Sequence, residues 1–137
     1  MRLSLLTLLF AVQSAWAQGF AGLWQTYGDA GAQPESLVRI EETEGGIRGT
    51  VIRVFAPPAK SSDPRCEACA GALKDQPIVG MRILQAQSSG EGEILDPGDG
   101  RVYRCTLTLV QGGTRLEVRG YVGVPILGRT QTWRRIE

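Results

Sequence analysis

Two cysteines three residues apart are the residues whose types and spacing most directly indicate chemistry. Cys66 and Cys69 lie in a segment with Asp63 and Pro64 just before it and Gly71 just after it. Asp at a helix N-cap, Pro at the first helical position and Gly past the end predict a single helical turn with both thiols on one side. A cysteine at a helix N-terminus has a lowered pKa, so this arrangement is typical of thiol–disulfide exchange.

A structural disulfide between Cys66 and Cys69 is the alternative, and we favour it. No thioredoxin-like βαβ pattern surrounds the motif, and a small chain with long loops gains stability from a cross-link. The third cysteine, Cys105, shares its strand face with apolar neighbours, which predicts a buried spare thiol. Pairing of Cys105 with Cys66 or Cys69 stays open at this point. Haem attachment would require His where Ala70 stands, and a zinc site would lack a fourth ligand.

The chain contains no histidine, which removes the commonest general base and the commonest metal ligand. It also lacks G-x-S-x-G, H-E-x-x-H and P-loop motifs. Acidic side chains gather at residues 41–44 and at Asp96 and Asp99, where a solvated hairpin and a tight turn explain them better than a catalytic pair or a calcium site. We therefore expect no catalytic centre, no metal and no cofactor.

The apolar pattern predicts a meander of short antiparallel strands. Glycine is abundant, with 18 residues, and no segment shows a long helical period. Residues 44–46, 96–100 and 112–113 predict tight turns, Gly49 predicts a bulge, and residues 57–77 form a long interruption. The predicted strands are residues 20–27, 36–42, 47–55, 78–84, 92–95, 101–110, 114–122 and 129–136.

About eight strands joined by hairpins predict an all-β domain, which we expect to close as a small up-and-down barrel rather than pack as a sandwich. Closure is indicated by a cluster of Trp24, Arg119, Arg129 and Trp133, in which a guanidinium from Arg119, Arg129 or Arg135 would cover Trp24. Ordinary core packing is the alternative for the two tryptophans. The interior is either a filled core or the lining of a site for one small ligand. The side chains expected there are Val38, Ile40, Val51, Met81, Tyr103, Leu107, Leu116 and Val118.

The first 17 residues have the order of a secretory signal peptide. Arg2 is followed by an apolar run over residues 3–12, too short to span a bilayer, and by a cleavage pattern that ends at Ala17. Cleavage there would leave one domain, residues 18–137, in the periplasm or outside the cell. Removing Arg2 from the 15 basic residues leaves 14, equal to the 14 acidic ones, so net charge favours neither nucleic acid nor an anionic membrane. The remainder has no apolar run of spanning length.

Several short stretches together have a specific order of glycine, proline, cysteine, arginine and tryptophan. They are Gly22-Leu23-Trp24, Val38-Arg39-Ile40, Asp63-Pro64 with Cys66 and Cys69, Ile94-Leu95-Asp96-Pro97 leading to Tyr103 and Cys105, and Arg119-Gly120-Tyr121 through Gly128-Arg129-Thr130-Gln131-Thr132-Trp133. With this order the chain resembles the bacterial secreted proteins grouped as domain-of-unknown-function family 2147. The resemblance implies a small antiparallel barrel similar to lipocalins and other calycins, and it carries no catalytic residues over.

Three functions are compatible with these observations. We favour a lipocalin-like binding module for a small apolar ligand. The second is an envelope interaction protein with a filled barrel and no ligand, which would use a surface such as the uncharged turn at residues 123–127. We expect that turn to plug the barrel end instead. The third is a thiol–disulfide oxidoreductase that uses Cys66 and Cys69. The sequence specifies no protein partner.

Overall fold

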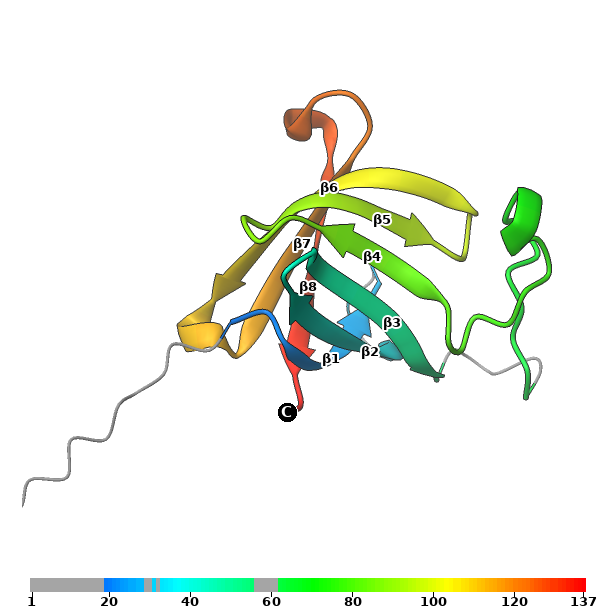
Figure 1. Cartoon of the computed structure of the whole chain (residues 1–137), viewed down its shortest axis with the longest axis horizontal. Helices are drawn as coiled ribbons and strands as arrows, with labels where there is room; N and C mark the ends of the chain where they lie inside the picture. Colours follow the sequence, from blue (N-terminus) through cyan, green and yellow to red (C-terminus); the bar gives the residue numbers. More distant parts are fainter. Residues whose placement is uncertain (1–18, 29–30, 32, 56–61) are drawn as a thin grey trace, which may run out of the picture.

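The chain folds into a closed antiparallel barrel in a computed structural model that describes residues 19–28, 31, 33–55 and 62–137 (Figure 1). Each strand pairs with the next, and the last returns to the first, where Trp24 lies opposite Arg135. This confirms the predicted all-β barrel. The strands are β1 (Gly22–Tyr27), β2 (Pro34–Thr43), β3 (Gly46–Val54), β4 (Arg82–Ala86), β5 (Glu91–Asp96), β6 (Arg101–Val110), β7 (Arg115–Tyr121) and β8 (Arg129–Arg135). Short 3₁₀ helices η1 (Gly71–Leu73), η2 (Gln111–Gly113) and η3 (Pro125–Leu127) lie in the connections.

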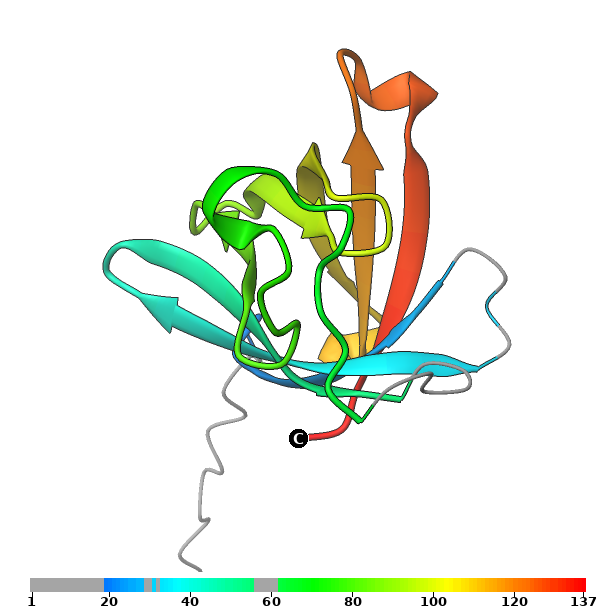
Figure 2. The same ribbon diagram turned by 90° about the vertical axis from the view of Figure 1, so that its right-hand side faces the viewer.

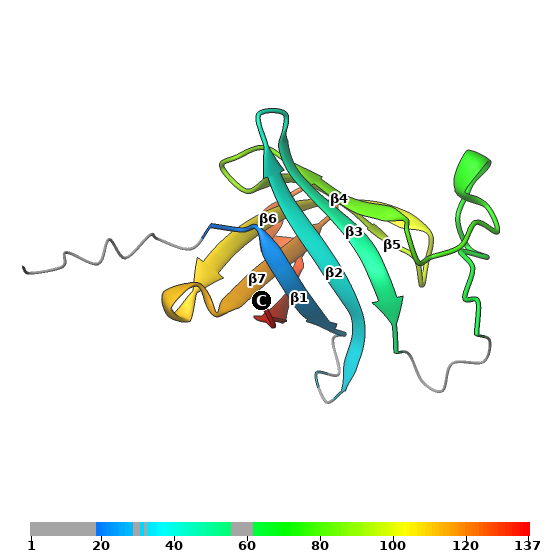
Figure 3. The same cartoon turned by 60° about the horizontal axis from the view of Figure 1, so that its bottom comes forward.

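Alternation of side chains along the strands explains why they close around an interior. In β6, Cys105 and Leu107 are buried, whereas Arg104 and Thr108 are exposed, because successive side chains of a strand point to opposite faces. The same period of two places Leu116 of β7 inside, opposite the inward face of β8. Figure 3 shows β1, β2 and β3 side by side across one wall.

Register shifts interrupt the β1–β2, β2–β3 and β3–β4 pairings, and the last two bend the wall around β3. Ile52 is the extra residue of β3 against β2, and Ile83 is the extra residue of β4 against β3. The shift between β3 and β4 therefore follows Gly49, where the sequence predicted a bulge. The additional residue, however, is Ile83 of β4 and not a residue of β3. Gly49 itself allows close approach, since a Cβ there would lie 2.8 Å from the Cβ of Leu84. Such bulges increase local twist and help a sheet to close.

The two ends of the barrel carry different connections between the strands. Because the strands alternate in direction, the β2–β3, β4–β5 and β6–β7 connections gather at one end with the start of β1 and the end of β8, and we call this the closed end. The β1–β2, β3–β4, β5–β6 and β7–β8 connections gather at the other, the open end. The packed core includes Trp24, Val38, Ile40, Ile47, Val51, Leu84, Leu107, Leu116 and Trp133.

The β3–β4 connection is the long loop that the sequence predicted, and it is described from residue 62 onward. The single helical turn predicted there is wrong. Arg65 forms a β-bridge with Pro77, and the Cys66 N–H donates to the Gln76 carbonyl at 2.9 Å, so the backbone is used in extended pairing and the 3₁₀ turn begins only at Gly71.

The predicted signal peptide, residues 1–17, lies outside the described residues. Within the ranges that are described, no helix has the length and apolar character needed to cross a membrane.

Candidate functional site

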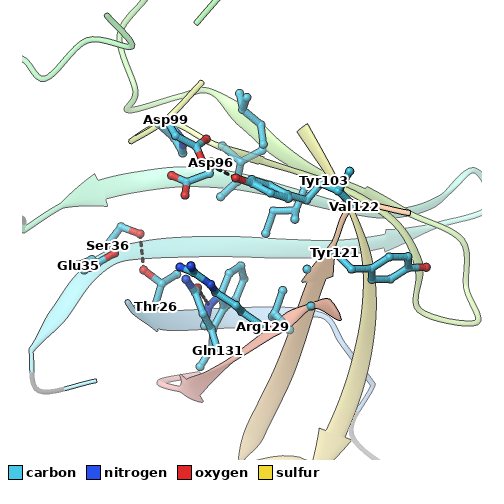
Figure 4. Close-up of a pocket in the computed structure, with 18 of the residues that line it drawn as sticks. Thr26, Glu35, Ser36, Asp96, Asp99, Tyr103, Tyr121, Val122, Arg129 and Gln131 are labelled. Carbon is cyan, nitrogen blue, oxygen red and sulfur yellow. Dashed lines mark hydrogen bonds between the residues drawn. The ribbon is translucent and has the colours of Figure 1, made fainter. Parts of the chain in front are cut away.

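A cavity of about 480 Å³ lies at the open end of the barrel. Figure 4 shows Asp96, Asp99 and Tyr103 on one side of the cavity and Thr26, Arg129 and Gln131 on the other; its lining residues come from β1, β2 and β4 to β8. Several core side chains, among them Leu95, Val118 and Trp133, also line the cavity, so it opens directly onto the packed core. The cavity is therefore the part of the interior that can take up another molecule.

The inner part of the cavity is apolar. Trp133 is 1% exposed and Val118 is 4% exposed, and both line the cavity together with Ile83 and Ile94. The indole N–H of Trp133 donates to the Gln131 side-chain oxygen at 3.2 Å, so its polar atom is satisfied within the wall. This floor offers burial to an aliphatic or aromatic group.

The rim of the cavity is polar. The Tyr103 hydroxyl donates a hydrogen bond to the Asp99 carboxylate, and this raises the pKa of Tyr103 because ionisation would remove the donated proton and break the bond. Thr26 and Ser36 share a hydroxyl–hydroxyl hydrogen bond of 2.7 Å on the opposite wall. These side chains offer donors and acceptors to a polar group at the mouth.

Charges of both signs border the cavity. The carboxylates of Glu35, Asp96 and Asp99 line it, and Arg129 supplies positive charge. Figure 4 shows Arg129 and Gln131 pointing into the space between the walls. Asp96 and Asp99 also fold the β5–β6 turn, because each accepts a 2.8 Å hydrogen bond from a backbone N–H two residues on, those of Gly98 and Arg101.

The predicted interior residues divide between the cavity and the core. Tyr103 and Val118 line the cavity. The others are buried in the packed core: Val38, Ile40, Val51, Met81, Leu107 and Leu116. Most of the rim residues could not be predicted from the sequence, because polar residues near strand ends have the same pattern as the residues of ordinary turns.

The predicted closing cluster is only partly brought together. The guanidinium over Trp24 is that of Arg135, 4.3 Å from the ring centroid. Arg129 lines the cavity at the other end, and the Nε–H of Arg119 donates to the Pro125 carbonyl at 2.9 Å, so neither covers Trp24. Trp133 is buried in the core and floors the cavity.

The cysteine loop packs against the cavity rim through the β5–β6 turn. Cys66 and Cys69 form a disulfide, with Cα atoms 5.3 Å apart, which confirms the favoured pairing. Both are buried, at 0% and 4% exposure. The Cys66 sulfur lies 3.5 Å from the Pro97 carbonyl oxygen, a contact rather than a hydrogen bond because the bonded sulfur carries no hydrogen. A Cβ on Gly100 would lie 2.0 Å from the Ala68 carbonyl oxygen, which shows how closely loop and turn approach.

Cys105 is the free thiol and is buried in the wall between β5 and β7. Burial, assisted by the negative charge of Glu93, raises the pKa of this thiol to about 11. The side chain is therefore protonated at neutral pH, which makes it a poor nucleophile and a poor metal ligand. In the part of the chain that the structure describes, no three His, Cys, Asp or Glu side chains gather in a way that could hold a metal ion.

The apolar turn at residues 123–127 does not plug the barrel end, contrary to the sequence-based expectation. Val124 is 52% exposed and Ile126 is 83% exposed. β7 and β8 run on past the wall (Figure 2), and within their connection Val122, Leu127 and Gly128 border the cavity whereas Val124 and Ile126 do not.

Comparisons with known proteins agree with this architecture. A family model described as "Uncharacterized protein conserved in bacteria (DUF2147)" matches residues 22–135. A similar solved structure is described as "Protein HP1028 from the human pathogen Helicobacter pylori belongs to the lipocalin family"; its TM-score is 0.69 at 20% identity, with 85% of this chain and 82% of that chain covered. A search of curated proteins found no match. At this identity the structural likeness concerns the fold.

Proposed function

The chain belongs to the bacterial family DUF2147, as the sequence resemblance indicated, and from this premise we propose that it is a lipocalin-like binding protein that holds a small, mostly apolar molecule. The observation that carries the proposal is the cavity of about 480 Å³ at the open end. Binding pockets commonly measure roughly 300–1,000 Å³. The alternative function, an envelope interaction protein without a ligand, assumes a barrel filled by its own side chains, and such a barrel would not leave this space.

The lining supports a ligand with two chemically different ends. An apolar portion would pack on Trp133, Val118 and Ile94, where it loses contact with water. A polar end would meet the rim, where Tyr103 and Arg129 stand among carboxylates. Mixed charge at the rim favours a group that both donates and accepts hydrogen bonds over a simple anion or cation.

The burial of both disulfide sulfurs argues against a thiol oxidoreductase. Exchange requires a thiolate to reach a disulfide sulfur along an open path. Cys66 is fully buried and Cys69 nearly so, with the loop backbone folded around them. A structural cross-link that fixes the loop beside the cavity rim fits these facts better.

Export is part of the proposal. Residues 1–17 would be the secretory signal, and the disulfide supports an oxidising compartment, since such bonds persist there. Identification of the first residue of the protein recovered from periplasm or medium tests this. We expect Gln18; a chain that still begins at Met1 and stays in the cytoplasm would refute export.

The binding proposal is tested by filling the cavity from its own wall. Gly120 lines the cavity, and a Cβ there would meet only the Cβ of Tyr103, at 3.7 Å. Gly120→Leu should therefore occupy ligand space without displacing the backbone. Val102→Leu is the matched control, because Val102 lies on the outer face of β6 and is 57% exposed.

Two measurements read the result. Native mass spectrometry of the protein purified from its host should show a mass excess that disappears on denaturation. Titration with the apolar probe N-phenyl-1-naphthylamine should show binding that is weaker by about tenfold or more in Gly120→Leu and unchanged in Val102→Leu, since the lost burial is worth about 1.5–3 kcal/mol. A bare native mass together with equal probe binding by all three proteins would refute the proposal.

A further inference from the structure

The β7–β8 connection carries the most exposed apolar side chains of the described chain. Ile126, Leu127 and Val122 are 83%, 77% and 67% exposed, and Val124 is 52% exposed. We call these four residues the aliphatic tip. Figures 1 and 2 both show this connection projecting beyond the neighbouring ones at the open end. Exposed aliphatic residues grouped in this way, rather than scattered singly, indicate a contact surface.

Part of the tip backbone is already hydrogen-bonded, which lowers the cost of a surrounding of low polarity. Within it, the Leu127 N–H donates to the Val124 carbonyl at 3.2 Å and the Gly128 N–H donates to the Pro125 carbonyl at 3.0 Å. Pro125 has no N–H to satisfy, and its carbonyl also accepts from the Arg119 side chain at 2.9 Å. A segment can enter the edge of a bilayer only when its backbone polar groups are largely satisfied.

Two arginines lie at the base of the tip outside the cavity. Arg119 near the end of β7 reaches the tip backbone, whereas Arg129, which begins β8 directly after the tip, points into the cavity. Arg104 of β6 is exposed and pairs across the ladder with Tyr121, the last residue of β7. Residues 122–128 contain no charged side chain. In an anionic lipid surface the acyl chains lie deeper than the phosphates. A tip of aliphatic residues with arginines at its base has the same sequence of apolar and charged layers.

We propose that the aliphatic tip docks the open end of the barrel on the surface of an anionic phospholipid bilayer. The side chains of Val124 and Ile126 enter the boundary between headgroups and acyl chains, and the guanidinium groups of Arg104 and Arg119 meet lipid phosphates. The near-neutral net charge adds no long-range attraction, so the local arrangement supplies the affinity. The carboxylates Glu35, Asp96 and Asp99 border the same cavity as Val122 and Leu127, so burial of the tip must outweigh their repulsion of lipid phosphates.

The shape and composition of the tip favour a lipid surface over a protein. The tip projects from the barrel and is purely aliphatic, with Val122 and Leu127 also bordering the cavity. The cores of protein interfaces are instead enriched in aromatic residues, methionine and arginine that meet a matching surface. A second copy would require a concave apolar receptor, and the open-end cavity has charged residues on its rim. Docking goes beyond the proposed function and does not require a ligand in the cavity.

The experiment compares vesicle binding by variants that share all other residues. Purified protein is floated with vesicles of phosphatidylcholine alone or of phosphatidylcholine with phosphatidylglycerol. The test variant is Val124→Ser with Ile126→Ser, because neither residue lines the cavity. The matched control is Val102→Ser with Ile136→Ser, which removes a valine and an isoleucine that are 57% and 47% exposed elsewhere on the surface. Any contribution from residues 1–17 is common to all the proteins.

We expect the unaltered protein and the control to float with the phosphatidylglycerol vesicles and less with phosphatidylcholine alone, and added salt to weaken binding. The test variant should bind at least about tenfold more weakly. Gly120→Leu should still bind vesicles, which separates this inference from ligand binding in the cavity. Failure of the unaltered protein to float, equal binding by the test variant, or self-association that the test variant abolishes would overturn the inference.

Discussion

The guanidinium of Arg135 lies 4.3 Å from the ring centroid of Trp24, and this contact seals the closed end of the barrel where the first and last strands meet. Arg135 also donates to three backbone carbonyls: those of Gly113 at 2.7 Å, Ala21 at 2.7 Å and Gly19 at 2.5 Å. Burial lowers the pKa of Arg135. One side chain therefore joins β8 to the N-terminal segment and to the β6–β7 connection.

Removal of this guanidinium should destabilise the whole barrel. We expect Arg135→Ala to lower the free energy of unfolding by about 2–4 kcal/mol, because the stacking and several charge-assisted hydrogen bonds are lost together. Arg135→Lys should recover only part of the loss, since an ammonium cannot reach three separate carbonyls. Urea denaturation followed by tryptophan fluorescence measures both changes.

Arg134→Ala is the control for that prediction. Arg134 lies 5.2 Å from the ring centroid of Tyr27, but it is on the outer face and exposed. Its loss should cost no more than about 1 kcal/mol. Equal destabilisation by Arg135→Ala and Arg134→Ala would show that the contacts of Arg135 with Trp24 and the three carbonyls do not stabilise the barrel.

The sequence predicted the barrel because strand alternation is a local property. In β6 the period of two is unbroken over Arg101–Val110, and the turn at residues 96–100 has the residues that such turns require. The disulfide was also accessible, since a spacing of three brings Cys66 and Cys69 close in any compact turn. These features need no knowledge of distant contacts.

The partner of Trp24 and the cavity rim could not be predicted in the same way. Arg119, Arg129 and Arg135 have equivalent sequence contexts, and only the register between β1 and β8 places Arg135 on the ring. The rim combines residues from five strands and their connections, with polar types that also suit solvent. Which part of the interior stays unfilled depends on packing across the whole barrel.

Because the cysteine loop contacts the β5–β6 turn, we expect that adding one methyl group at Gly100 will strongly lower the free energy of unfolding. Gly100 has φ +71° and no room for a Cβ, which would lie 2.0 Å from the Ala68 carbonyl oxygen. Gly112 has φ +67° and nothing within 4 Å of its Cβ position. Both alanine variants bear similar backbone strain of about 1 kcal/mol, but only Gly100→Ala must also displace the loop.

We therefore expect Gly100→Ala to lower the free energy of unfolding by about 1–3 kcal/mol more than Gly112→Ala does. Denaturant titration of the two variants gives the difference. Amide exchange in residues 62–80 should also rise in Gly100→Ala alone. Matching stability and exchange in both variants would mean that the loop does not rest on the turn.

The disulfide should stabilise its loop rather than the barrel. Replacing both Cys66 and Cys69 with serine opens a very short covalent ring, for which chain entropy gives a loss of about 1–2 kcal/mol. Hydrogen exchange should accelerate in residues 62–80 and stay unchanged in β6 and β7. The unaltered protein should not catalyse reduction of insulin by dithiothreitol, because both sulfurs are buried. Rapid catalysis that the double variant abolishes would instead establish redox chemistry.

Alkaline pH should destabilise the fold through Cys105. Burial raises the pKa of this thiol from its ordinary value of 9.0 to about 11 in the folded protein, where the side chain is 1% exposed. As pH rises through this interval, the unfolded chain loses the proton first, so the unfolded state is favoured. The thiol's contribution is therefore fully present below about pH 9 and is lost by about pH 11, with a total change of about 3 kcal/mol.

Cys105→Ala isolates this effect, because the variant has no thiol at position 105 to titrate. The difference in unfolding free energy between the two proteins should be constant below pH 9 and should shrink between about pH 9 and pH 11. Tyr103, whose pKa is also raised, titrates in both proteins and cancels in the difference. Denaturation at several pH values gives the two curves. Parallel curves over the whole interval would show that the folded thiol ionises as readily as the unfolded one, and that β5 and β7 do not exclude water from it.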